Sequence, residues 1–325
     1  MRRRDFIKII SGSAAAWPFA VRAQQAAMPM IGFLRTGSLI QVPYFVNAFR
    51  RGLKEADYVE GQNVVIEFRS ADNQRDRLPA LVADLLGRPV SVIAGDNVAA
   101  LAAKAATKTI PIVFAGGGDP VQEGLVASLN RPGGNLTGVS NMFTELIPKR
   151  LELLADLTPQ ANVFALLVDP NLPGAERMIR EGQEAARVKG MQLHIVKAGT
   201  ESEIDAAFKA LVELHLPALI VSVDAFLNNS RGQIVALAAR YAVPTVYGVR
   251  DYVNAGGLMS YGTDLVDGYR QVGIYAGKIL KGARPADLPI QQVTKVALVI
   301  NLKTAKMLGL TIPTTLLGRA DEVFE

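Results

Sequence analysis

Short apolar segments alternate with helical patterns along almost the whole chain, and this alternation limits its fold more than any other feature. Residues 28–37 form the first apolar segment, and an amphipathic helical pattern follows over residues 44–56. Further apolar segments occupy residues 64–69, 90–95 and 110–116, with helical patterns between them. They are apolar on both faces, which is typical of parallel strands covered by helices on both sides. The pattern predicts an α/β fold built from βαβ units.

The two halves of the chain repeat one arrangement. In the first half the segment VIAGD leads through AALAAKAATKTIPIVFAG, and in the second IVSVD leads to IVALAARYAVPTVYGV. Each copy is a strand ending in Asp, an Ala-rich helix, a proline and a second strand ending near glycine. The repeat predicts two similar α/β lobes of one architecture. A single larger doubly wound sheet is the alternative.

Turn-forming stretches suggest where the chain passes between the lobes. Residues 129–141, LNRPGGNLTGVSN, interrupt the alternation and are the first candidate crossing. We therefore expect lobe 1 to comprise residues 28–140 plus 257–290, and lobe 2 residues 141–256 plus 291–325. Several crossings would hold the lobes together while leaving a hinge between them.

The positive charge of the chain is concentrated at its N-terminus. The formal net charge is +5, of which residues 1–23 carry +4, so the remainder carries only +1. A nearly neutral body lacks the basic surface that a phosphate backbone requires, so we expect no nucleic-acid partner.

The N-terminal segment has the features of an export signal. RRRDFIK resembles a twin-arginine signal, a short apolar stretch follows, and Val21-Arg22-Ala23 fits a cleavage site after Ala23. An ordinary secretory signal or a disordered basic arm are the alternatives. The chain contains no cysteine, and so no disulfide and no cysteine to carry a lipid anchor. We expect a signal peptide over residues 1–23 and a soluble periplasmic protein.

The glycine run in AGGGDPVQEGL (residues 115–125) is similar to a phosphate-binding loop but lacks its requirements. A dinucleotide fingerprint needs a third glycine where Val121 stands, and a P-loop needs Gly-Lys-Ser/Thr. What remains is bare backbone at Gly117 and Gly118, where a ligand or the other lobe can approach closely. A plain glycine turn is the alternative.

Residues typical of catalysis are sparse. His194 and His215 lack metal-ligand spacing, and neither a G-x-S-x-G nor an H-E-x-x-H motif occurs. Carboxylates that follow strand-like segments could serve a carboxylate-dependent enzyme, or could simply cap helices. They are Asp96, Asp119, Asp169, Asp224 and Asp251. We assign no catalytic residue, no metal ligand and no cofactor.

Strand ends of both lobes carry groups suited to binding a small molecule. A ligand ammonium group needs a carboxylate, and a ligand carboxylate needs helix N-terminal amides with a nearby hydroxyl. Tyr247 could stack on a ligand or belong to the core. The candidate ligand-binding residues are Thr36, Gly37, Asp96, Asn97, Gly117, Gly118, Asp119, Asp224 and Tyr247.

Four longer stretches resemble a known family. They are TKTIPIVF, DPVQEGLVASLNRPGGNLTGVS, AGGLMSYGTDLVDGYRQVGIYAGKILKGARPADLPIQQ and LVINLKTAKMLGLTIP. With them the chain resembles the periplasmic substrate-binding proteins of ABC transporters, in the branch that includes binders of aromatic amino acids. The resemblance implies a fold like that of type I periplasmic binding proteins, with two Rossmann-like lobes with parallel sheets, a multi-crossing hinge and ligand in the cleft.

One position departs from this family. Where members commonly carry a Thr-Pro-Ala-Ala opening after the third strand, this chain has GDNV over residues 95–98. An acid, Asp96, stands where a hydroxyl and free helix amides would receive a carboxylate. We therefore expect Asp96 to repel an anion and to favour an amine, a hydroxyl or a neutral ligand.

These observations favour a monomeric periplasmic solute-binding protein that delivers an amino acid or an aromatic or amine-like compound to an ABC permease. It would meet the membrane only through that permease. A secreted carboxylate-dependent α/β enzyme and a ligand sensor for a membrane partner are the alternatives. A repressor is disfavoured, because no DNA-binding helix pair precedes the first strand.

Overall fold

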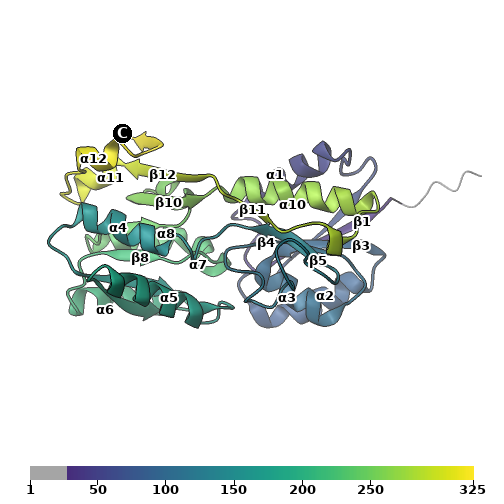
Figure 1. The fold of residues 1–325 in the computed structure, drawn as a ribbon, viewed down its shortest axis with the longest axis horizontal. Helices are drawn as coiled ribbons and strands as arrows, with labels where there is room; N and C mark the ends of the chain where they lie inside the picture. Colours follow the sequence, from purple (N-terminus) through teal and green to yellow (C-terminus); the bar gives the residue numbers. More distant parts are fainter. Residues whose placement is uncertain (1–27) are drawn as a thin grey trace, which may run out of the picture.

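The computed structural model describes residues 28–325, so the predicted signal peptide and its cleavage site lie outside the described residues. Within this range the chain forms two lobes that lie side by side (Figure 1). Each lobe is built on its own twisted sheet. No helix of residues 28–325 is long and apolar enough to cross a membrane.

Lobe 1 contains a six-stranded parallel sheet with the order β11-β5-β4-β3-β1-β2. Its strands are β1 (Met30–Arg35), β2 (Val65–Ser70), β3 (Val90–Asp96), β4 (Ile112–Gly116), β5 (Leu136–Ser140) and β11 (Gln291–Gln292). Its helices are α1 (Pro43–Glu55), α2 (Leu78–Leu86), α3 (Asn97–Ala106) and α10 (Leu265–Leu280), with 3₁₀ turns at Arg75–Arg77 and Pro285–Asp287. Strands β3, β4 and β5 are almost wholly buried because helices cover both faces of the sheet.

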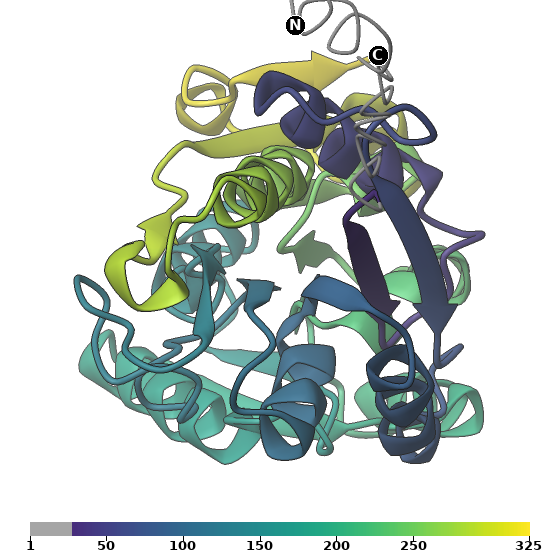
Figure 2. The same cartoon turned by 90° about the vertical axis from the view of Figure 1, so that its right-hand side faces the viewer.

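Two apolar layers enclose this sheet, as Figure 2 shows. Helices α1 and α10 pack on one face and α2 and α3 on the other. Where α1 and α10 cross, a Cβ on Gly273 would lie only 2.2 Å from the carbonyl oxygen of Phe49. The absence of a side chain at this glycine therefore allows the two helices to pack closely.

Lobe 2 contains a seven-stranded sheet with the order β13-β12-β10-β9-β8-β6-β7. Its strands are β6 (Val163–Val168), β7 (Gln192–Lys197), β8 (Leu219–Val221), β9 (Thr245–Tyr247), β10 (Met259–Thr263), β12 (Val296–Asn301) and β13 (Glu322–Phe324). Its helices are α4 (Ile147–Leu157), α5 (Ala175–Val188), α6 (Glu201–Glu213), α7 (Ala225–Asn229), α8 (Arg231–Arg240), α9 (Asp251–Asn254), α11 (Leu302–Met307) and α12 (Thr314–Leu317). Helices α4, α5, α11 and α12 cover one face, and α6, α8 and α9 the other.

The predicted lobe boundaries need two corrections. Strand β10, which we expected in lobe 1, pairs with β9 and β12 in the sheet of lobe 2, because the crossing follows this strand rather than its preceding glycines. Strand β11, expected in lobe 2, pairs with β5 in lobe 1. The β10–β12 pair is also antiparallel, so the sheet of lobe 2 is mixed rather than purely parallel.

The segments that join the lobes are tied to one another by side chains. Thr263 Oγ1 donates a hydrogen bond of 2.9 Å to the carbonyl of Asn141 on the neighbouring crossing. The fully buried Arg150 donates from Nη1 to the carbonyl of Phe143 at 3.0 Å and from Nε to that of Tyr261 at 2.8 Å. These contacts fix two crossings against helix α4 and give the hinge a defined base.

Candidate functional site

A cavity lies between the lobes, at the carboxyl ends of strands from both sheets. Its volume is about 70 Å³, and the space between its walls reaches about 720 Å³ when the open solvent at its mouth is included. Lobe 1 contributes the ends of β1, β3 and β4 and one side of α10, and lobe 2 contributes the loop after β6 and the start of α7. Ligands of open α/β sheets bind at this edge, because loops and helix N-termini converge there. We call this space the interlobe cavity.

Five of the nine sequence-predicted site residues line the interlobe cavity. They are Asp96, Asn97, Gly117, Gly118 and Asp224. The remaining four, which are outside its wall, are Thr36, Gly37, Asp119 and Tyr247. The structure therefore brings strand ends of both lobes together, but four of the predicted residues make structural contacts outside the cavity wall.

Asp96 ends β3 with both carboxylate oxygens already bonded. Thr36 donates to it twice, from its amide to Oδ2 at 2.7 Å and from its hydroxyl to Oδ1 at 2.6 Å. The amide of Ala99 donates to Oδ1 at 3.0 Å, which makes Asp96 the N-cap of α3. Thr36 is wholly buried, so it braces Asp96 instead of facing the cavity. The carboxylate of Asp96 thus occupies the N-terminus of α3, whose amides would otherwise be free to bind a ligand.

The bare backbone of the glycine run is used by protein groups. A Cβ on Gly117 would lie 2.8 Å from the ring of Phe143, and one on Gly118 would lie 2.1 Å from Glu123 Oε1. Asp119 accepts bonds from the amides of Val121 and Gln122 at 2.8 and 3.3 Å, and so shapes the turn rather than the wall. At both glycines the group that approaches closely is therefore a protein side chain, Phe143 or Glu123.

Gly37 lies where lobe 1 meets lobe 2. A Cβ at this position would stand 2.1 Å from Asn229 Nδ2 and 3.3 Å from the carbonyl of Ala225, both on α7 of lobe 2. The glycine therefore permits the contact between the lobes, rather than lining the cavity.

The two predicted residues of lobe 2 have different fates. Asp224 is 8% exposed, accepts from the amide of Leu227 at 2.8 Å through Oδ1, and leaves Oδ2 without a partner. Burial, and then the nearby charge of Asp169, raises the pKa of Asp224 to about 7. Tyr247 is instead fully buried and stacks on Tyr252 with ring centroids 4.4 Å apart, so the core alternative holds for it.

Sequence reasoning missed three charged residues in the cavity wall, Arg35, Glu123 and Arg177. Arg35 ends β1, and its position at the end of a buried strand was a signal that could have found it. Glu123 follows the glycine run, and burial raises its pKa to about 7 although Asn97 donates to it at 3.3 Å. Arg177 lies in α5, where its helical pattern resembles any solvated face.

Buried polar atoms without a partner gather around this cavity. Among residues 28–325 nine side-chain atoms are of this kind, and five belong to residues of the cavity wall. These five are Arg35 Nε, Asn141 Oδ1, Arg177 Nη2, Asp224 Oδ2 and Asn228 Oδ1. Buried donors and acceptors are normally satisfied, so the cavity is suited to a ligand that carries both kinds of group.

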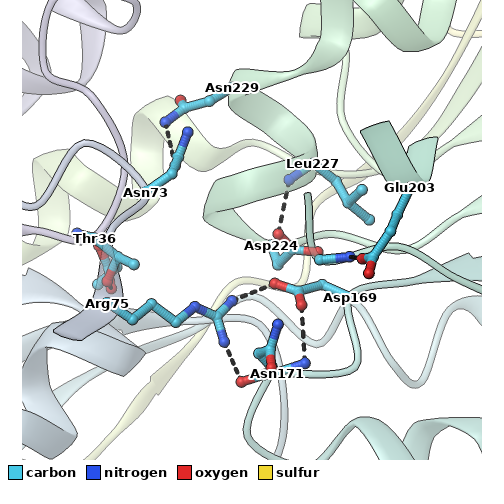
Figure 3. A network of polar contacts seen from close by, with 11 residues as sticks. Thr36, Asn73, Arg75, Asp169, Asn171, Glu203, Asp224, Leu227 and Asn229 are labelled. Carbon is cyan, nitrogen blue, oxygen red and sulfur yellow. Dashed lines mark hydrogen bonds and ion pairs between the residues drawn. The ribbon is translucent and has the colours of Figure 1, made fainter. Parts of the chain in front are cut away.

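Polar contacts join the lobes around the cavity, as Figure 3 shows. Arg75 of lobe 1 donates to the carboxylate of Asp169 and to the carbonyl of Asn171 in lobe 2. Asn229 Nδ2 donates to Asn73 Oδ1 at 3.0 Å. On another side of the interface the Tyr44 hydroxyl donates to Asp251 at 2.7 Å. Asp169 and Asp251, predicted as strand-end acids, thus serve the interface, and the lobes are closed on each other.

Comparisons with known proteins agree with this geometry. The family described as ABC transporter substrate binding protein matches residues 42–324. A tyrosine-binding protein of Clostridioides difficile strain R20291 is 28% identical over 267 residues, which cover 81% of this chain and 75% of that protein. Among solved structures, an ABC domain from Streptococcus pneumonia in complex with L-Trp has 26% identity and a TM-score of 0.84, covering 91% of this chain and 99% of that one. A conserved domain protein from Vibrio cholerae O1 biovar eltor strain N16961 has 26% identity, a TM-score of 0.83 and the same coverage.

These matches confirm the resemblance drawn from the four sequence motifs, and they confirm the predicted two-lobed fold class. Proteins of this kind bind a solute and do not transform it, so the carboxylate-dependent enzyme is set aside. With a family match that runs from α1 to the C-terminal strand, the chain belongs to the substrate-binding proteins of ABC transporters.

Proposed function

We propose that this protein captures an amino-acid-like small molecule in the interlobe cavity and delivers it to an ABC permease. The observation that carries the proposal is the cavity itself. It has walls from both lobes, and it collects five of the nine unpartnered buried polar atoms of residues 28–325.

The chemistry of the wall supports an amine-bearing ligand with an apolar part. Asp224 Oδ2 is buried and unpartnered, and a ligand ammonium group would compensate its charge. Phe45, Phe143 and Met178 supply apolar surface for a side chain. The relatives named for tyrosine binding and solved with L-Trp point to the same class. Of the nine sequence candidates we retain the five in the wall as residues of the site, and Asp224 is the one among them with an unpartnered side-chain oxygen for the ligand.

Closure would couple binding to delivery. A ligand that touches both lobes binds better when they are closed, so it shifts the population toward the closed form. The ion pair of Arg75 with Asp169 and the bond between Asn73 and Asn229 form only when the lobes meet, and they would stabilise that form. The permease would recognise the surface that the two closed lobes share.

The place of action follows from the N-terminal sequence. We propose twin-arginine export, cleavage after Ala23 and function as a soluble periplasmic monomer. N-terminal sequencing of the protein from a periplasmic fraction should begin at Gln24. Recovery of the uncleaved chain from the cytoplasm would contradict this part of the proposal.

Native mass spectrometry of gently purified protein tests the capture function. We expect a small molecule that leaves on unfolding, and that raises the melting temperature when added back. At a hundredfold excess over its Kd, a ligand stabilises the protein by about 2.7 kcal/mol. If neither native mass spectrometry nor a melting screen over amino acids, aromatic acids, amines and sugars finds a ligand, the capture function is wrong.

A further inference from the structure

Arg35 is a buried cation in the wall of the interlobe cavity. It is the last residue of β1, and its side chain faces the cavity while only 3% of the residue is exposed. Within residues 28–325 no carboxylate forms an ion pair with it, and its Nε has no hydrogen-bond partner. A buried charge normally has a counter-ion, so this guanidinium has unused capacity to bind an anion.

Neutral groups hold the guanidinium in place. Nη1 donates to the Tyr269 hydroxyl at 2.7 Å, and the guanidinium carbon lies 5.0 Å from the centre of the Phe45 ring and 5.7 Å from that of Tyr269. Burial raises the pKa of Tyr269 to about 12, so its hydroxyl stays neutral and does not compensate the charge. The two rings orient the planar group, and its buried Nε has no hydrogen-bond partner among the described residues.

Asp96 does not take the role of counter-ion. Its two oxygens accept from Thr36 and from the amide of Ala99. Because Thr36 follows Arg35 directly, these bonds fix the backbone from which Arg35 projects. Asp96 therefore positions the arginine, and it also blocks the N-terminus of α3, where an anion would otherwise bind.

We propose that Arg35 binds a carboxylate group of the ligand, so that the solutes captured by this protein are acids. This rests on the proposed capture function and names the ligand class. It also reverses the sequence-based expectation that Asp96 makes the site favour amines or neutral ligands over acids. A carboxylate suits the planar fork of one arginine.

Matched ligand pairs test the proposal on the wild-type protein. The probes are the proteinogenic amino acids, each beside its carboxamide and its decarboxylated amine, and aromatic acids, each beside its carboxamide. L-tyrosine, L-tyrosinamide and tyramine form one such set. Melting shifts identify the binders, and titration calorimetry gives their Kd values. We expect acids alone to bind strongly, with each carboxamide about a hundredfold weaker, because it leaves the buried charge unpaired.

Variants assign the preference to a residue. Arg35→Gln should abolish the advantage of the acid over its amide, and Arg35→Lys, which keeps the charge but not the fork, should retain part of it. Arg177→Gln is the comparison variant, since Arg177 is the other arginine of the wall but already has a counter-ion, Glu181, at 3.1 Å. It should preserve the ratio between acid and amide.

Each remaining outcome decides the matter. Amides or amines that bind as tightly as the matching acids overturn the proposal. So does a preference for acid over amide that is lost in Arg177→Gln but kept in Arg35→Gln. Neutral sugars or amines that bind when no acid does overturn the proposal and leave the capture function intact. Absence of any binder overturns both. If Arg35→Gln does not fold, the wild-type pairs and Arg35→Lys still decide.

Discussion

Arg75 offers the sharpest test of closure, because its side-chain contacts with the rest of residues 28–325 lie across the interface between the lobes. It projects from a 3₁₀ turn of lobe 1 to the carboxylate of Asp169 and the carbonyl of Asn171 in lobe 2 (Figure 3). Arg75→Met keeps much of the side-chain length and removes the charge and the donors. The variant leaves Asp169 buried without its cation when the lobes are closed.

The magnitude follows from the burial of the pair. Asp169 has 2% of its side chain exposed, and Arg75 has 22%. Removing one partner of a fully buried pair costs about 3–5 kcal/mol. The partial exposure of Arg75 reduces this to about 2 kcal/mol. Since the contact exists only in the closed form, the cost falls on closure, and ligand Kd should rise roughly thirtyfold.

Titration calorimetry with the ligand that co-purifies measures this change. Arg77→Met is the matched control, because Arg77 lies on the same turn and its ion pair with Asp72, at 3.4 Å, stays within lobe 1 and is largely exposed. It should change the Kd by less than about twofold. Equal ligand affinity in Arg75→Met and Arg77→Met would refute the idea that this contact stabilises closure.

Three further predictions concern Asp224 and Gly37. Asp224→Asn keeps the helix cap but removes a buried uncompensated carboxylate. In thermal melts at pH 8 it should therefore stabilise the ligand-free protein by about 2 kcal/mol, and it should weaken the binding of amine-bearing ligands at least tenfold. Asp264→Asn, at an exposed cap, should do neither. Because the pKa of Asp224 is raised from 3.8 to about 7, its burial destabilises the ligand-free protein increasingly as pH rises through that interval, whereas calorimetric affinity for an amine should rise as the carboxyl ionises. Gly37→Ala should bind the ligand about tenfold more weakly at an unchanged melting temperature, because its Cβ would lie 2.1 Å from Asn229 Nδ2 when the lobes are closed. Gly232→Ala, which has open space around it, should bind the ligand normally. Equal ligand affinity in the two variants would contradict this prediction.

The fold could be predicted from the sequence because its signals are local. Apolar strands, Ala-rich helices and the repeated strand–helix–strand pattern depend on residues close in the chain, and they determined both lobes. The exact crossing points depend on which strands pair across long distances. The glycines before β10 look like a crossing, yet β10 stays in lobe 2 because it bonds to β9 and β12 there.

The site could be predicted only in part, for the same reason. Strand ends follow from the fold, so Asp96 and Asp224 could be placed near the cavity. Whether an acid is free or already bonded depends on a partner far along the chain, as with Thr36 and Asp96, which are 60 residues apart. Arg177 reaches the cavity because the lobes close, and no local pattern reports that contact.

The two charged poles of the cavity explain how a ligand could drive closure. Arg35 belongs to lobe 1 and Asp224 to lobe 2, and each has an unpartnered buried atom. An amino acid with its carboxylate on Arg35 and its ammonium on Asp224 would connect the lobes and compensate both charges at once. A solute with only one of these groups would compensate one charge and favour the closed form less. On this argument a ligand with two opposite charges both binds more tightly and closes the protein more completely than one with a single charge.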